Sequence, residues 1–211
     1  MWKSVVCGVC ALLLLSGSAL AEDVEFQAPE AGSIRLTIRP TGARLFDDGV
    51  AALSADKHLA GGDLAVGYRL FDALWLEANW VIRAAPDTVY GVVETQLEVN
   101  DLRANVMWHV LPDGWMRPYL KAGAGRRFLH TAWSAGGSRV AARDQAWMVQ
   151  GAAGLELLGS LKELSESFGM GLSLEMGYEQ SGAMSLARDG VEMGQLNTSA
   201  LVWSAGVVFQ F

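Results

Sequence analysis

The chain has 211 residues and an acidic balance, with 23 Asp and Glu residues against 16 Lys and Arg residues and a formal net charge of −7. This composition gives no support for a nucleic-acid partner, and we expect none. Hydrophobic residues make up 51% of the sequence. Beyond the first 21 residues, however, no apolar run approaches the roughly 18 residues that a membrane-spanning helix needs. The apolar residues are dispersed, so their spacing carries the structural information.

The first 21 residues predict a secretory signal peptide. Lys3 supplies a short positive region, residues 5–15 are mostly apolar, and small residues follow over 16–21, which is the order typical of such segments. Ala19 and Ala21 place small residues at the two positions that the peptidase reads. We therefore expect cleavage after Ala21, followed by a periplasmic N-terminal segment over 22–32.

Both cysteines, Cys7 and Cys10, lie inside the predicted signal peptide. The mature chain would therefore contain neither a disulfide nor a thiolate metal site. A lipoprotein acceptor role for Cys10 is disfavoured, because too little apolar sequence precedes it. Loss of Lys3 with this segment takes the formal net charge of the mature chain to −8.

Beyond residue 32, large apolar residues recur at every second position in eight segments: 33–40, 63–70, 74–83, 102–110, 116–128, 147–157, 168–179 and 201–211. This period is the signature of a strand with one apolar face. The other face combines small residues with isolated charges, as where Glu175 and Glu179 alternate with glycine and serine. A narrow polar interior and an apolar exterior are typical of a small membrane barrel. The sequence therefore predicts an all-β fold, an eight-stranded antiparallel up-and-down transmembrane β-barrel over 33–211.

The connections between these segments alternate in length, as outer-membrane barrels require. Tight turns are expected at Asp72-Ala73 and at Pro112-Asp113-Gly114, and a longer polar turn at 161–167. Four long polar or glycine-rich links are predicted to form surface loops, at 46–60, 84–95, 131–144 and 181–197. The run Asp47-Asp48-Gly49 is interpreted as a turn, since the oxygen ligands of a calcium loop do not follow it. The run 135–138 is interpreted as a flexible loop, since a phosphate-binding loop needs a lysine and a following helix.

Aromatic residues fall where the strand ends should meet lipid headgroups. On outward positions we expect Trp108 and Phe209 toward the periplasm, and Trp80, Trp147, Tyr178 and Trp203 toward the outside, forming two aromatic girdles. Arg126 shares the lipid-facing parity, but its height places it near the outer interface, where an arginine costs only about 0–1 kcal/mol. Leu97 and Val99 differ in parity from Leu102, which predicts a β-bulge near Asn100 and Asp101.

The segment Arg117-Pro118-Tyr119-Leu120-Lys121-Ala122-Gly123-Ala124-Gly125 resembles the Pro-Tyr and alternating-glycine strand of the small OmpA-like outer-membrane barrels. The terminal Val207-Val208-Phe209-Gln210-Phe211 is similar to the aromatic-ended signal of that family. The resemblance implies that Phe209 and Phe211 form an assembly signal read by the barrel assembly machinery. It covers the barrel only, without the peptidoglycan-binding domain of OmpA. It implies residence in the outer membrane of a Gram-negative cell, with outer-membrane lipid and lipopolysaccharide as surroundings.

Thirteen charged residues have inward parity and are predicted to form a charge network in the lumen: Arg35, Arg39, Asp63, Arg69, Glu77, Arg83, Arg103, Arg117, Lys121, Arg127, Glu156, Glu175 and Glu179. Opposite charges in a narrow barrel must pair, because an unpaired buried charge is costly. We therefore expect a salt-bridged network that closes the lumen, in a protein with a structural or surface-interaction role. The alternative is a narrow porin or ion channel.

A lipid-modifying barrel enzyme is the less favoured alternative. The lipid A deacylases among such barrels carry a His-x-Ser pair, and none of His58, His109 and His130 is followed two residues later by serine. His109 has inward parity and is expected to join the network. We predict no enzyme, no catalytic residues, no cofactor and no metal site, and the sequence leaves any partner of the loops open.

Overall fold

The computed structural model describes residues 32–52, 57–160, 168–188 and 191–211. The predicted signal peptide (1–21), nearly all of the predicted periplasmic segment (22–32) and the predicted turn at 161–167 lie outside the described residues. Within these ranges, no helix combines the length and the apolar character needed to cross a bilayer.

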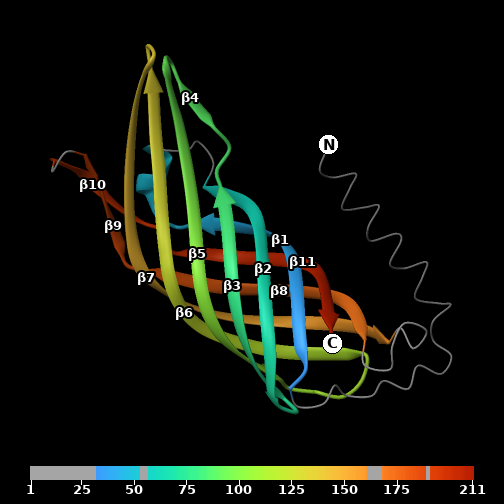
Figure 1. Cartoon of the computed structure of the whole chain (residues 1–211). Helices are drawn as coiled ribbons and strands as arrows, with labels where there is room; N and C mark the ends of the chain where they lie inside the picture. Colours follow the sequence, from blue (N-terminus) through green and yellow to red (C-terminus); the bar gives the residue numbers. More distant parts are fainter. Residues whose placement is uncertain (1–31, 53–56, 161–167, 189–190) are drawn as a thin grey trace.

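Eight long antiparallel strands close into a barrel, as the alternation predicts (Figure 1). They are β1 (Ile34–Leu45), β2 (His58–Phe71), β3 (Leu74–Ala84), β5 (Val93–His109), β6 (Met116–Ala135), β7 (Ser138–Ser160), β8 (Gly169–Ser181) and β11 (Ala200–Gln210). Each of these pairs with the next, and β1 pairs with β11 to close the ring. At this seam the Ile34 amide donates to the Phe211 carbonyl at 3.1 Å. The fold class predicted from the sequence is confirmed.

The barrel has two unlike ends. The tight turn at Asp72-Ala73 joins β2 to β3 and the 110–115 turn joins β5 to β6 at one end, where the seam residues Ile34 and Phe211 also lie. We call this the short-turn end. Longer connections occupy the other end, the hairpin end, where β5, β6 and β7 rise far beyond the other barrel strands (Figure 1).

The four predicted surface loops contain regular structure. A 3-10 helix, η1 (Asp48–Ala52), lies in the first, β4 (Thr88–Tyr90) pairs with the start of β5 in the second, and β9 (Ala183–Arg188) pairs with β10 (Val191–Asn197) in the fourth. The third, predicted as a surface loop over 131–144 with a flexible run at 135–138, is instead a regular strand hairpin. The β6–β7 ladder continues to Ala135 and Ser138. Gly136 and Gly137, with φ of 56° and 83°, make the turn, because a two-residue hairpin of this kind needs left-handed backbone at both positions.

The inward and outward faces follow the predicted parity. On β1, Ile38 is 52% exposed on the outside while Arg35 and Arg39 are buried inside. The same alternation runs along the other strands of the barrel.

The predicted bulge at Asn100 and Asp101 is absent from β5, and that prediction is wrong. This strand pairs without interruption with β3 and with β6. Leu97, Val99 and Asp101 all point inward and are nearly fully buried. The parity therefore stays constant. What changes is the interior of the barrel, which turns from charged to apolar above Asp101.

Two apolar layers close the interior, one toward each end. Toward the hairpin end lies a cluster that we call the apolar cap, made of Ala43, Leu45, Val50, Leu59, Ala85, Leu97, Val99, Leu129, Ala146, Met184, Leu196, Ala200 and Val202. Trp133 and Leu186 pack against it. Toward the short-turn end, Trp75, Met107 and Tyr119 form a second cluster, the aromatic floor. Most of the charged residues of the lumen lie between these layers.

Candidate functional site: the charged lumen

The structure places all thirteen predicted network residues in the interior of the barrel. Twelve of them are buried as whole residues, and the Glu175 side chain is 9% exposed. Their strands bring most of them together as two groups of ion pairs, one above the aromatic floor and one below the apolar cap. We call these the lower cluster and the upper cluster.

The lower cluster is organised around two arginines of β1. The Arg35 guanidinium lies 2.7 Å from the Glu156 carboxylate and 3.3 Å from that of Glu77. Arg39 contacts Asp63 at 2.7 Å and Glu175 at 3.0 Å. These contacts link β1 to β2, β3, β7 and β8, so the cluster ties together strands from the whole ring.

Lys121 completes the lower cluster from β6. Its ammonium group contacts Glu77 at 3.3 Å and Glu175 at 2.5 Å. The Tyr119 hydroxyl also donates to Glu175, at 2.9 Å, and connects the cluster to the aromatic floor. Three cations, Arg35, Arg39 and Lys121, thus lie among four carboxylates, which leaves this cluster with a formal charge of −1.

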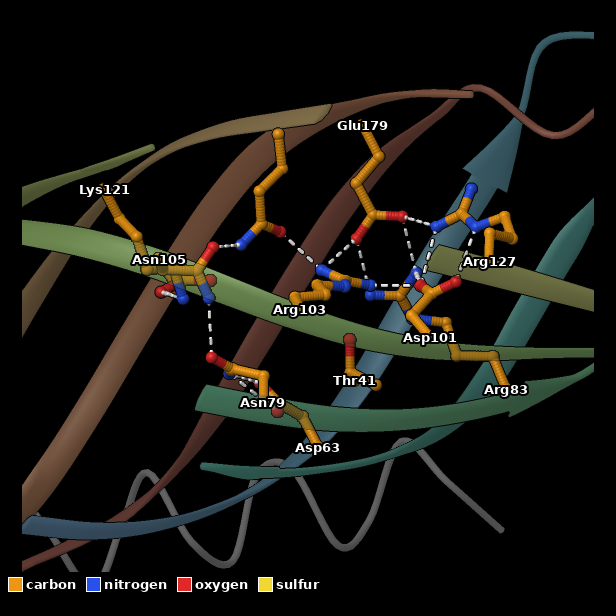
Figure 2. Close-up of polar contacts among 12 residues, drawn as sticks. Thr41, Asp63, Asn79, Arg83, Asp101, Arg103, Asn105, Lys121, Arg127 and Glu179 are labelled. Carbon is orange, nitrogen blue, oxygen red and sulfur yellow. Dashed lines mark hydrogen bonds and ion pairs between the residues drawn. The ribbon is translucent and has the colours of Figure 1, made fainter. Parts of the chain in front are cut away.

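The upper cluster has the opposite imbalance (Figure 2). Arg83 donates two hydrogen bonds to the Glu179 carboxylate, both at 2.8 Å, and Arg127 donates two to Asp101, both at 2.7 Å. Arg103 pairs with both carboxylates, at 2.7 Å for Glu179, and Arg127 also reaches Glu179. Three arginines therefore lie around two carboxylates, with a formal charge of +1.

A chain of neutral amides connects the two clusters. Arg103 donates to the side-chain amide oxygen of Gln150, and the Gln150 amide nitrogen donates to the Asn105 amide oxygen. The Asn105 amide nitrogen in turn donates to the Asn79 amide oxygen at 2.6 Å. Asn79 then donates to the Asp63 carboxylate at 2.9 Å. Every amide points the same way, from the cluster with excess positive charge to the cluster with excess negative charge. The aligned side-chain dipoles therefore favour the observed distribution of charge.

Three interior residues lie near the short-turn end, and two of them contact the turns. Arg69 donates to the Asp72 carbonyl at 2.6 Å, and Arg117 donates to the Gly114 carbonyl at 3.1 Å. Both arginines were predicted to belong to the charge network, and both contact a turn at this end of the lumen, where Arg69 also lies 3.7 Å from the Asp72 carboxylate. His109, in contrast, meets the Glu156 carboxylate at 3.0 Å, below Arg35.

The two ion-pair clusters fill the interior between the two apolar layers, and this sets what the lumen can do. Buried ion pairs offset the cost of removing charge from water only when their geometry and hydrogen bonding are good. Here each of the six cluster carboxylates meets at least one cation, as in the bidentate contacts of Glu179 and Asp101. In the part of the chain that the structure covers, no group of His, Cys, Asp and Glu has the arrangement of a metal site. The arrangement fills and rigidifies the barrel.

The sequence reasoning missed Asp101 and the amide chain. Asp101 is 1% exposed and bonds Arg127 and Arg103. It was assigned to a bulge, although it shares parity with Arg103. Asn79, Asn105 and Gln150 share the inward parity of the charged residues and are buried, but no pattern in the sequence indicates that they touch one another.

Five of the six predicted girdle aromatics are exposed on the outer surface, and the sixth, Phe209, is half-buried; the five are Trp80, Trp108, Trp147, Tyr178 and Trp203. Trp80 and Trp147 lie on one rung of paired residues with Leu102 and Arg126 between them. Arg126 stacks over the Trp147 ring, 4.6 Å from its centroid. Its position at the girdle agrees with the predicted interfacial height.

The last residues pack around an aromatic group at the short-turn end. The Phe168 ring lies 5.4 Å from that of Phe211 and 6.5 Å from that of Phe209, measured between ring centroids. Phe211 is 55% exposed on the outside of the barrel. The two predicted assembly-signal residues therefore share an outward aromatic surface beside the seam.

Comparisons with known proteins agree with this fold. No family model and no curated protein matches the chain by sequence. Among solved structures, Ail, the attachment invasion locus protein of Yersinia pestis, is 16% identical with a TM-score of 0.54, over 86% of this chain and 100% of its own. Neisserial surface protein A is 13% identical with a TM-score of 0.52, over 88% of this chain and 100% of its own. Ail in complex with the heparin analogue sucrose octasulfate is 13% identical with a TM-score of 0.50, over 86% and 100%.

At these identities the similarity defines the architecture, a small eight-stranded barrel of the outer-membrane type. The surface agrees, because large apolar side chains such as Ile38, Val66 and Leu102 are exposed all around a charged interior. A closed barrel with this distribution is suited to lipid and not to water. The chain is an outer-membrane β-barrel. In such barrels short turns face the periplasm and longer loops face outward, so we expect the hairpin end to be the extracellular one.

Proposed function

We propose that this chain is a closed, non-conducting outer-membrane barrel whose role is structural or lies in surface interaction through its extracellular hairpins. The observation that carries the proposal is that paired charged side chains and two apolar layers occupy the lumen. Two oppositely imbalanced ion-pair clusters are joined by amides and lie between the aromatic floor and the apolar cap. A conducting pore needs a hydrated path, whereas eight-stranded interiors are just filled by side chains.

The surface role is supported by the height of the β6–β7 hairpin. The β7–β8 ladder ends at Met148 and Ser181, so residues 138–147 of β7 extend beyond β8. On the other side the start of β5 and the short β4 widen the projecting sheet. This gives a paired, rigid surface above the membrane, which is suited to contact with a partner. Ail, a protein of the same architecture, has been solved with a heparin analogue bound, so a sulfated polysaccharide is a reasonable first ligand to test.

The proposal places the chain among the OmpA-like barrels. Its support is the β6 segment with alternating glycines, which the structure explains. A Cβ on Gly123 would lie 1.9 Å from the Asn105 amide oxygen and 2.4 Å from the Ala104 carbonyl. Glycine at this position therefore lets β5 approach and lets the amide chain pass. The proposal also includes a cleaved signal peptide, recognition of Phe209 and Phe211 by the barrel assembly machinery, and lipopolysaccharide as surrounding lipid.

The competing functions are a narrow porin and a lipid-modifying enzyme. The porin alternative would use the same charged residues as an ion path, gated at the apolar cap. The enzyme alternative has little support from the histidines. His109 lies inside, bonded to Glu156, while on the outside His58 packs against Trp203 and the His130 ring accepts a hydrogen bond from Arg143. We propose that the chain has no catalytic activity.

Reconstitution in planar bilayers tests the closed lumen. The purified, folded protein should give no conductance or only rare, small openings, in both polarities and at high salt. A general porin inserted by the same procedure serves as the positive control. Large, stable conductance steps from this protein would contradict the closed barrel and support the porin alternative.

A further inference from the structure

The outward face of the β6–β7 hairpin carries a column of basic side chains above the aromatic girdle. Arg126 lies opposite Trp147 at the girdle, His130 lies opposite Arg143, and Ser134 lies opposite Arg139 near the tip. These residues have lipid-facing parity, so they leave the barrel on the side where outer-leaflet lipid lies. We call Arg126, His130, Arg139 and Arg143 the basic column.

The contacts within the basic column leave its cationic groups available. The Arg143 Nε donates to His130 Nδ1 at 3.0 Å, Arg139 donates to the Gln96 amide oxygen at 3.0 Å, and Arg126 stacks on Trp147. Among the described residues, none of these three arginines forms a salt bridge, unlike the buried arginines of the lumen. Neutral partners orient the guanidinium groups without cancelling their charge.

Two carboxylates lie on the outward face of the neighbouring β5. Glu98 is opposite His130 and accepts a hydrogen bond from Asn100 at 2.6 Å, and Glu94 is opposite Ser134. They flank Gln96 on this face, and the Arg139 guanidinium reaches across β6 to the Gln96 amide oxygen, so its charge lies on the same side as both carboxylates. Arg126 on β6 and Arg143 on β7 therefore carry the positive charge of the column away from β5.

The height of the column matches the phosphate layer of an outer leaflet. Arg126 shares its rung with Trp80 and Trp147, which mark the upper edge of the apolar belt. Arg143 is four residues from Trp147 along β7, about 13 Å at the rise of an extended strand. A guanidinium presents paired donors that match phosphate oxygens. Cations at this height would therefore meet anionic headgroups rather than acyl chains.

We propose that the basic column binds the phosphate groups of lipopolysaccharide, with Arg126 and Arg143 meeting the phosphates of its lipid A part and Arg139 meeting anionic groups further out. This inference rests on the proposed orientation in the outer membrane, and it specifies which residues contact the proposed lipid partner. Lipid is favoured over a soluble polyanion because the column lies on the side of the barrel and continues the girdle. A soluble ligand would instead be expected at the hairpin tips.

The test compares two variants of the full-length protein. The triple variant Arg126→Gln, Arg139→Gln, Arg143→Gln removes the charge of the column and keeps hydrogen-bonding groups. The matched control is Arg44→Gln, an exposed outward arginine on β1, across the ring from β6. Cold-gel migration confirms that each variant is folded. Binding of bisphosphorylated and of fully dephosphorylated lipid A is then measured on nanodisc-embedded protein by native mass spectrometry.

We expect the triple variant to lose about tenfold in affinity for bisphosphorylated lipid A, since exposed charge-assisted contacts are individually modest. Its affinity for the dephosphorylated lipid should not change, and Arg44→Gln should behave as the unmodified protein. The difference should shrink at 1 M salt, where the screening length falls to about 3 Å. Equal binding of both lipids by all proteins would overturn the proposal, and so would an unchanged affinity of the triple variant for bisphosphorylated lipid A. Conductance in planar bilayers does not depend on lipid A binding. Failure of the closed-lumen proposal is therefore distinguishable from failure of the lipid A site.

Discussion

Glu179 is the residue whose loss should unbalance the lumen most. It accepts two hydrogen bonds from Arg83 at 2.8 Å, lies 2.7 Å from Arg103 and also meets Arg127. In Glu179→Gln only Asp101 remains for three buried arginines, and the formal charge of the upper cluster rises from +1 to +2. Breaking a buried ion pair on one side costs about 3–5 kcal/mol. We expect a loss of this size in the free energy of unfolding.

The measurement is urea unfolding in lipid vesicles, followed by tryptophan fluorescence and by cold-gel migration. Two variants sharpen it. Glu98→Gln removes an outward carboxylate and should change the free energy of unfolding by less than about 0.5 kcal/mol. The double variant Glu179→Gln, Arg83→Gln restores the charge of +1, so it should recover part of the loss despite carrying one more substitution. If Glu179→Gln is no less stable than Glu98→Gln, or if the double variant is less stable by the sum of both single effects, the charge balance argued here is wrong.

Three further predictions concern other parts of the barrel. Deleting Phe211, or exchanging Gln210 and Phe211, should lower outer-membrane levels on fractionation, while Gln210→Ser should behave normally. The lost aromatic contact is worth at most about 1.5–3 kcal/mol. Normal insertion of the truncated and exchanged chains would exclude an assembly signal at Phe211. Leu129→Ala opens a cavity in the apolar cap and should cost about 2–5 kcal/mol in urea unfolding, whereas the outward Phe128→Ala should cost clearly less. Lys57 lowers the pKa of the exposed Asp48 carboxyl through a hydrogen bond and through its charge. Their contact therefore stabilises the fold above the ordinary carboxyl pKa, and this stabilisation is lost as the pH falls through the lowered pKa. Lys57→Met should raise the pKa of Asp48 in an NMR titration, and an unchanged pKa would refute the pairing.

The strand faces were predictable from the sequence because they depend only on local parity. A strand places successive side chains on opposite faces, so Arg35 and Ile38 could be assigned without knowing their neighbours. The bulge at Asn100 and Asp101 was predicted wrongly for a related reason. We expected the interior to be polar along its whole height, so the inward Leu97 and Val99 were interpreted as a shift in register. They instead begin the apolar cap.

The ion-pair partners within the lumen could not be predicted, because they depend on the level of each inward side chain along the barrel axis. Arg83 on β3 meets Glu179 on β8, from the opposite side of the barrel, at a sequence separation of 96 residues. Only the stagger of eight strands brings them level, and no local pattern encodes it. The long β6–β7 hairpin was missed for a different reason. Its small and polar residues have loop-like composition, and only the Gly136-Gly137 turn indicates a tight hairpin.

Closing the seam between β1 and β11 brings the charged residues of the first strand to their partners on the last strands. Arg35 and Arg39 belong to the first strand of the barrel, yet their carboxylates come from β2, β3, β7 and β8. While the sheet is still open, these arginines face water, and a bilayer would reject them. The pairing of β1 with β11 therefore has to coincide with the exclusion of water from the lumen. We therefore expect insertion to be all-or-none. A chain that lacks either terminal strand could not bury its charges as ion pairs and should not insert into the membrane.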